Sequence, residues 1–306
     1  MSLGSAVKDR SAASATLAAA DTLAPIDRTP TMVVRPRTGW QTTDLRELWR
    51  FRDLLWFLAL RDIQIRYKQT ALGVLWAVLQ PVVSVVVLTI IFGHFLGVAG
   101  TVPPVNGKDV PYPVFLFAGQ LPWTLFAAAV TASSNSLIGN ADILRKVYFP
   151  RILMPLAALG APLLDYVLAF AVFLGVMLWF NVVPGWALLL TPLLLAFTLI
   201  NVLGVGILLA ALNVSYRDFK YVVPFMLQLW FFVTPVIYPV KILPDAWSWL
   251  LYLNPMVGPI EAFRAVVLGS ELILTRILIS TAIGALGLLI GAAYFGRVER
   301  RFADIA

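Results

Sequence analysis

The pattern of hydrophobic and polar positions changes near residue 70 and divides the chain into an amphipathic part and an apolar part. Before the change, residues 44–70 carry apolar side chains at helical spacing with charged residues interleaved, which predicts an amphipathic helix. We expect the charges to lie on one face and Trp49, Trp56 and Phe57 on the other, as is typical of a helix in the membrane interface. Lys68 is the last charged residue of this part, and the hydrophobic run that begins at residue 71 predicts a helix that crosses the membrane.

Six hydrophobic runs follow the amphipathic helix, each long enough to cross a hydrocarbon core about 30 Å thick. Proline and glycine interrupt several runs, which neighbouring helices tolerate in a bundle. We therefore expect an all-α integral membrane domain over 71–300, with an N-terminal cytoplasmic amphipathic interface helix over 44–70. Residues 1–43, rich in Ala, Ser, Thr and Pro, are expected to be a disordered cytoplasmic tail. The six predicted transmembrane helices are 71–97, 113–134, 152–180, 186–212, 222–240 and 272–295.

The connection between the fifth and sixth runs, residues 241–271, is too apolar for a solvated loop. It holds two short apolar pieces, 245–253 and 257–268, on either side of the helix breaker Asn254-Pro255. Neither piece is long enough to span a membrane, and such lengths are typical of re-entrant segments. Non-helical backbone at membrane depth is tolerated only where it is buried in protein or lines a cavity. We therefore expect an outer re-entrant helical hairpin that marks the transport pathway.

Composition and charge agree with a protein packed in lipid. Of the 306 residues, 60% are hydrophobic and 13% are charged, and the mean hydropathy is +0.87. The net charge of +7 does not indicate nucleic acid binding, because the basic residues lie in the connections between hydrophobic runs. Basic connections alternate with neutral or mixed ones, so the positive-inside rule places both termini in the cytoplasm. The absence of cysteine excludes disulfides and thiolate metal sites, and the single histidine, His94, is expected to be interfacial.

No nucleotide-binding motif is visible in the sequence. Gly107-Lys108 is followed by Asp109 and lacks the upstream glycine that a phosphate-binding loop needs. If the protein moves a substrate uphill, the energy therefore comes from another chain.

Five stretches together make the chain resemble the permease subunits of type-2 ABC exporters, in the branch for O-antigen, capsule and teichoic-acid polysaccharides. Each stretch alone is weak, but their order and their placement on six spans carry a resemblance that covers residues 44–300. The stretches are Arg61-Asp62 with Arg66-Tyr67-Lys68, Gly73, Trp76 and Gln80-Pro81; Lys146-Val147-Tyr148-Phe149-Pro150-Arg151; Asn213-Val214-Ser215-Tyr216-Arg217-Asp218; Leu229-Trp230 with Thr234-Pro235 and Tyr238-Pro239; and Asn254-Pro255-Met256 with Glu261 and Arg264.

The resemblance implies a homodimer in the bacterial cytoplasmic (inner) membrane, paired with two copies of an ABC ATP-binding subunit that holds ATP and Mg²⁺. This chain would then contain no catalytic residue, metal or cofactor. Its substrate would be a lipid-linked glycan, and membrane lipids would surround it. The alternative is a type-2 ABC permease for a small hydrophobic drug or lipid, which shares the six spans. A secondary transporter or a membrane glycosyltransferase would need mid-membrane ionisable pairs or acidic sugar-nucleotide motifs, which we do not find in the sequence.

A short segment between the second and third spans, residues 140–151, corresponds to the helix that contacts the ATPase in such exporters. Its basic residues and its exposed Tyr148 and Phe149 suit an interface, although the charges alone also fit a membrane anchor. Asp218, in a later connection, fits either a second ATPase contact or a helix cap. The residues expected to couple to the ATPase are Leu144, Arg145, Lys146, Val147, Tyr148, Phe149, Pro150, Arg151, Arg217 and Asp218.

The charges of the interface helix have two interpretations. They can anchor the helix among anionic lipid headgroups, or they can attract the diphosphate of a substrate that enters beside it, because arginine binds phosphate bidentately. The residues expected at this substrate entrance are Arg50, Arg52, Arg61, Arg66 and Lys68.

Aromatic residues make up 12% of the chain, and many are typical of an interfacial belt. A subset suits a channel, because the apolar faces of sugar rings stack on aromatic side chains. The residues expected to line a channel are Trp76, Phe225, Trp230, Phe231 and Tyr238.

Polar residues within the apolar part provide the last candidates. The resemblance implies an outer gate at Asn254, Pro255, Glu261 and Arg264, in which Glu261 and Arg264 are spaced to pair on one helical face. Asp165 lies in the middle of the third span, where an acid is costly and is a candidate functional residue. We favour a polar contact of Asp165, with a group such as Thr198 or Asn201, over a proton relay.

Overall fold

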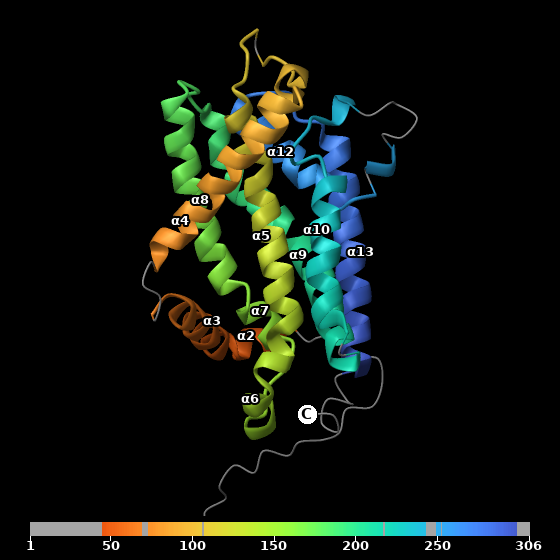
Figure 1. Ribbon diagram of the computed structural model, residues 1–306. Helices are drawn as coiled ribbons and strands as arrows, with labels where there is room; N and C mark the ends of the chain where they lie inside the picture. Colours follow the sequence, from red (N-terminus) through yellow and green to blue (C-terminus); the bar gives the residue numbers. More distant parts are fainter. Residues whose placement is uncertain are drawn as a thin grey trace, which may run out of the picture. The chain divides into compact units, whose positions relative to one another are not determined.

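The computed structural model describes residues 45–68, 73–105, 107–216, 218–242, 249–251 and 253–298. Within these residues the chain is helical, with one isolated bridge between Val105 and Lys108 (Figure 1). The all-α prediction is confirmed for this part of the chain, and the predicted tail over 1–43 lies outside it. In chain order, the elements are α2 Leu45–Arg50, α3 Arg52–Tyr67, α4 Val74–Leu88, η1 Thr89–Phe95, η2 Val98–Thr101, α5 Tyr112–Gly139, α6 Ala141–Lys146, α7 Leu153–Ala157, α8 Gly160–Trp179, η3 Trp186–Leu190, α9 Thr191–Ser215, α10 Phe219–Val233, η4 Val240–Ile242, α12 Val257–Leu268 and α13 Leu274–Val298.

Five helical stretches are long and apolar enough to cross a membrane. They coincide with the first, second, third, fourth and sixth predicted spans. Their bounds are Leu75–Phe95, Tyr112–Gly139, Leu153–Trp179, Trp186–Ser215 and Leu274–Val298.

The fifth predicted span, 222–240, contains a shorter helix, because α10 ends at Val233. Thr234 has extended backbone angles, which is the conformation that a following proline imposes on its neighbour. The apolar segment nevertheless continues inside the protein, since residues 234–237 are all buried. The count of six spans therefore stays a prediction.

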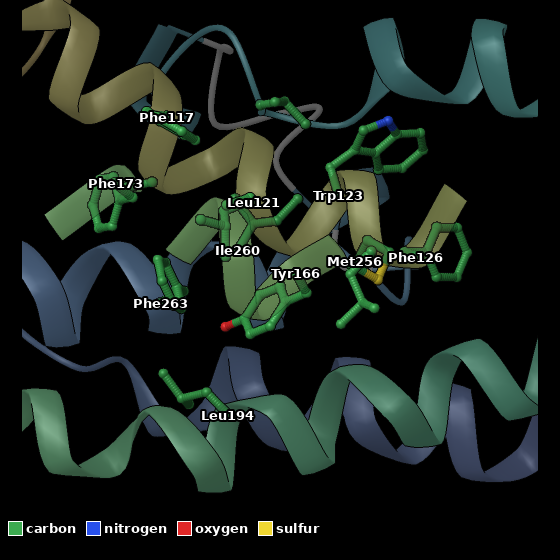
Figure 2. Close-up of a cluster of buried hydrophobic side chains, with 14 of the residues drawn as sticks. Phe117, Leu121, Trp123, Phe126, Tyr166, Phe173, Leu194, Met256, Ile260 and Phe263 are labelled. Atoms are coloured by element: carbon green, nitrogen blue, oxygen red, sulfur yellow. The ribbon is translucent and has the colours of Figure 1, made fainter. Parts of the chain in front are cut away.

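Helix α5 lies at the centre of the described bundle and packs against α8, α9, α10 and α12 (Figure 1). Of its apolar window, 78% is buried within the chain, against only 6% of the first span, so α4 presents most of its surface outward. Side chains from several helices fill the core around α5. Figure 2 shows Phe117, Leu121, Trp123 and Phe126 of α5 with Tyr166 and Phe173 of α8, Leu194 of α9, Ile260 and Phe263 of α12, and Met256, which precedes α12.

Helices α9 and α13 approach each other through glycines. A Cβ added at Gly204 would lie 2.5 Å from the backbone oxygen of Gly284, which no real Cβ does. Small residues allow such close approach between membrane helices, where packing rather than the hydrophobic effect drives association.

The predicted interface helix is two helices, α2 and α3, which meet at Phe51. One stripe of α3 packs on α7 and α8, where Leu58 is buried, and Gly160 lets α8 approach Ala59. Trp56 and Phe57 face away from the protein and are exposed, as expected for a helix beside lipid. Asp53, three and four positions before them, is exposed on the same face, so the expected separation of charged and aromatic faces was wrong.

Candidate functional site

An open cavity of about 1240 Å³ lies between the end of α3 and helices α4, α5, α8 and α10. It exceeds the range of about 300–1,000 Å³ that is usual for small-molecule pockets. Among the residues predicted to line a channel, Trp76 and Phe231 contribute to its wall. Trp123 and Tyr166, which the sequence analysis did not place in a channel, also line it. We refer to this space as the large cavity.

The other predicted channel residues lie elsewhere in the described structure. Trp230 packs edge-on against Phe126, with ring centroids 5.3 Å apart. Phe225 is exposed on α10, and the hydroxyl of Tyr238 donates to the carbonyl oxygens just before the end of that helix. Their role in a channel between protomers stays a prediction.

The wall of the large cavity also carries amide and hydroxyl groups. Gln120 donates from Nε2 to Ser84 Oγ at 2.7 Å, and its buried Oε1 has no hydrogen-bond partner among the described residues. An unpaired buried acceptor is costly, so a ligand hydroxyl would satisfy it. Gln120 is a functional candidate that the sequence analysis missed, although an amide within the apolar run 113–134 could have indicated it.

A cluster of one acid and two partners lies where the last turn of α3 meets α8. Arg66 forms an ion pair with Asp165, with 2.6 Å between Nη2 and Oδ2, and the hydroxyl of Tyr67 donates to Asp165 Oδ1. All three residues line the large cavity. Burial, followed by the hydrogen bond to Asp165, raises the pKa of Tyr67 to about 12, so its hydroxyl stays protonated at neutral pH.

The expected partners of Asp165 were therefore wrong. Thr198 and Asn201 use their side-chain donors on backbone carbonyls of their own helix. The sequence gives no sign of the true contact, because Arg66 and Tyr67 belong to a helix assigned to the interface and lie almost 100 positions earlier in the chain.

The five basic residues predicted at the substrate entrance separate in the structure. Arg66 lines the large cavity. Arg61 donates to Asp62 and, at 2.7 Å, to Oδ1 of Asn140, at the junction of α5 and α6. Arg52 stacks on Trp49 with 5.6 Å to the ring centroid. Arg50 and Lys68 are exposed.

The predicted coupling segment has an inner and an outer side. Tyr148 is 62% exposed, whereas Phe149 is only 4% exposed and packs in an apolar cluster with Leu58 and Leu137. The expectation that both aromatic residues are exposed was therefore wrong for Phe149. Lys146 and Val147 are also exposed, next to Tyr148.

Two further coupling candidates lie in the connection before α10. Arg217 lies outside the described residues. Asp218 is exposed at the start of α10, where a negative charge is favourable, although its side chain makes no capping hydrogen bond. Both interpretations of Asp218 therefore stay predictions.

Helix α12, which contains Glu261 and Arg264, lies at the opposite end of the bundle from α3 and α6 (Figure 1). Arg264 is buried and donates to the carbonyl oxygens of Phe115 at 3.3 Å, of Pro235 at 2.6 Å and of Val236. Its guanidinium also lies 3.8 Å from the centroid of the Phe115 ring. The carbonyls of Pro235 and Val236 follow the end of α10 and lack helical partners, so Arg264 replaces the missing N–H groups there, whereas the carbonyl of Phe115 belongs to α5.

Glu261 forms its ion pair with Arg276, at 2.9 Å, so the predicted pairing with Arg264 was wrong. The reason is that Arg264 turns inward to the carbonyls, while Glu261 faces α13. Both residues border a second cavity of about 500 Å³.

Asn254 and Pro255 join this region to the end of α10. Asn254 donates from Nδ2 to Thr234 Oγ1 at 2.8 Å and accepts the backbone N–H of Met256. Ser280 of α13 accepts the N–H of Gly258. Asn254 and Arg264 thus belong to two buried groups of hydrogen bonds on either side of the turn after α10, and Glu261 belongs to a separate, partly exposed ion pair.

Among the residues that the structure describes, no group of three or more His, Cys, Asp or Glu side chains could hold a metal ion.

Comparison with known proteins identifies the family of the chain. The model of the family described as "ABC-2 type transporter" matches residues 53–268. An O-antigen export system permease protein RfbA of Myxococcus xanthus is 34% identical over 72% of this chain and 83% of its own length. A Klebsiella pneumoniae protein of the same name is 30% identical over 83% of this chain and 95% of its own length. The polysialic acid transport protein KpsM of Escherichia coli is 29% identical over 69% of this chain and 80% of its own length.

Replacement of Arg264 by lysine is expected to destabilise the protein. Lysine cannot reach three diverging carbonyls, and each buried carbonyl left unpaired costs about 1–3 kcal/mol. The same replacement at Arg276 is the matched control, because lysine can keep the partly exposed ion pair with Glu261. Thermal melting in detergent should show a clearly lower midpoint for Arg264→Lys than for Arg276→Lys, and equal midpoints would contradict this role of Arg264.

Proposed function

Because the chain belongs to the ABC-2 type transporter family, we propose that it is the membrane subunit of an ATP-driven exporter that moves a lipid-linked polysaccharide outward across the inner membrane. The names of the relatives support a polysaccharide as substrate. The observation that carries the proposal is the large cavity, whose aromatic and amide lining suits sugar rings and hydroxyls and whose edge carries Arg66. A substrate larger than a drug molecule also suits its volume.

Deletion of the gene tests this function against the alternative of a small hydrophobic drug or lipid. We expect loss of long surface polysaccharide, seen by gel electrophoresis of envelope extracts, with unchanged sensitivity to hydrophobic drugs. Return of the polysaccharide on complementation is the control. Increased drug sensitivity with intact polysaccharide would favour the alternative.

The proposed topology has six spans and an outer re-entrant hairpin over 241–271, with both termini in the cytoplasm. Helix α12 has 12 residues and so a length of about 18 Å, too short to cross a bilayer, yet it is almost entirely buried. It packs on α5, α9 and α13, as a re-entrant helix would. α10 and the buried turn after it would form the fifth span.

The absence of native cysteine makes this topology testable with single cysteines in an otherwise unchanged chain. Cysteines placed at Lys108 and Lys241 should react with a membrane-impermeant maleimide added to intact spheroplasts. Cysteines at Lys146 and Lys220 should react only after permeabilisation. Labelling of Lys220→Cys from outside would remove the fifth span from the proposal.

The complete exporter would contain two copies of this chain and two ATP-binding subunits that hold ATP and Mg²⁺, with no catalytic residue in this chain. The low burial of α4 within the chain supports a surface that a second copy or lipid covers. The exposed side of the coupling segment, at Lys146, Val147 and Tyr148, would contact the ATP-binding subunit.

A hydrogen bond supports transmission of movement from the coupling segment to the substrate entrance at the large cavity. Arg61 ties α3 to Asn140, at the start of α6, so a displacement of α6 would be passed to α3. The end of α3 carries Arg66 at the large cavity, where the substrate diphosphate would enter. Arg50, Arg52 and Lys68 do not line this cavity and would contact lipid headgroups. The region around Asn254, Pro255, Glu261 and Arg264 would form the outer gate.

Replacement of the neighbouring residues Tyr148 and Phe149 tests docking of the ATP-binding subunit and stability of the fold separately. Tyr148→Ala is expected to weaken binding of the ATP-binding subunit by about 2 kcal/mol, as is typical of an interface anchor, with a normal melting temperature. Phe149→Ala removes a buried ring and is expected to cost about 3–5 kcal/mol of stability. Co-purification of a tagged ATP-binding subunit and thermal melting measure the two effects, and a Tyr148→Ala protein that co-purifies normally would contradict the docking role.

A further inference from the structure

Asp165 is an anionic group on the wall of a cavity that, by the proposed function, receives an anionic substrate. Both of its carboxylate oxygens are engaged, one by Arg66 and the other by the hydroxyl of Tyr67. The Arg66 side chain is 48% exposed and that of Asp165 is 21% exposed, so the guanidinium is accessible from the cavity while the carboxylate lies further in.

A diphosphate has more negative charge and more acceptor oxygens than a carboxylate, and arginine binds phosphate oxygens bidentately. It would therefore compete with Asp165 for Arg66. If Arg66 turns to the diphosphate, Asp165 is not left without a donor, because the Tyr67 hydroxyl still bonds to it. Asp165 thus has two donors, Arg66 and Tyr67, and Arg66 is the more exposed of the two.

We propose that Asp165 is a specificity-determining residue, which occupies Arg66 until a lipid-linked diphosphate displaces it. The exchange would remove the ion pair between the end of α3 and α8 and leave only the hydrogen bond of Tyr67 there, so occupation of the cavity would loosen the attachment of the interface helix. Single-charge phosphate groups of ordinary lipids would compete less well against the ion pair. This inference rests on the proposed function in one respect, namely that the substrate carries a diphosphate.

The test uses the full exporter complex in nanodiscs of zwitterionic phosphatidylcholine, with radiolabelled farnesyl diphosphate as the probe. Asp165→Asn keeps an acceptor for Tyr67 but removes the competing charge, and it is expected to bind the probe at least about fivefold more tightly, a size usual for coupled sites. Arg66→Gln is expected to lose most of the binding. In the Arg66→Gln background, Asp165→Asn should bring no tightening, because the competition acts through Arg66.

Three outcomes would overturn the exchange. Unchanged or weaker binding by Asp165→Asn, with binding still lost in Arg66→Gln, would make Asp165 a structural support and leave the diphosphate site standing. Equal binding in all variants would show that this cavity edge holds no diphosphate, whatever the deletion experiment says about polysaccharide. Variant effects that appear only when phosphatidylglycerol is added to the nanodiscs would assign the site to lipid headgroups.

Asp165→Ser is the second variant, in case the asparagine protein does not assemble, because its hydroxyl also accepts from Tyr67. Tyr67→Phe is the control for loss of a hydrogen bond without loss of charge. It is expected to leave the probe affinity within about twofold of the unchanged protein, since the Arg66 ion pair stays in place. A Tyr67→Phe protein that binds as tightly as Asp165→Asn would contradict a competition between charges.

Discussion

The structure depends on one constraint, which is that a polypeptide surrounded by hydrocarbon must satisfy its backbone hydrogen bonds from within. The constraint is most severe where α10 ends, because the chain remains buried through Ile237 without helical geometry. Arg264 donates to Pro235 and Val236, and Tyr112 donates to Ile237 at 2.9 Å. The break in α10 is therefore possible only because donors from two other helices reach it.

The same requirement explains the residues around this break. A Cβ added at Gly119 would overlap the guanidinium of Arg264, so the central helix α5 needs glycine there to leave room for the arginine. Asn254 and Thr234 bind each other across the break and hold the start of α12 next to it. The consequence is a buried, hydrogen-bonded joint in the region proposed as the outer gate.

Local sequence signals predicted the features that depend only on local chemistry. Length and hydropathy place the helices Leu75–Phe95 and Leu274–Val298 correctly, because insertion in lipid depends on those two properties. The same signals cannot tell which face of an apolar helix is buried, so Tyr148 and Phe149 looked equivalent. Local signals also cannot predict contacts between segments that are distant in the sequence, and the ion pair of Arg66 with Asp165 is the clearest case.

Polar contacts connect α3 to the bundle at two points that lie five positions apart in the sequence. Arg61 holds Asn140 beside the coupling segment, and Arg66 with Tyr67 holds Asp165 at the cavity. Between and around these points α3 packs through few buried side chains, of which Leu58 is the most buried. Partly exposed ion pairs contribute little to stability, so they suit contacts that must break and re-form. The buried joint at Arg264 and the exchangeable contacts of α3 thus place buried polar contacts at one end of the bundle and partly exposed ones at the other.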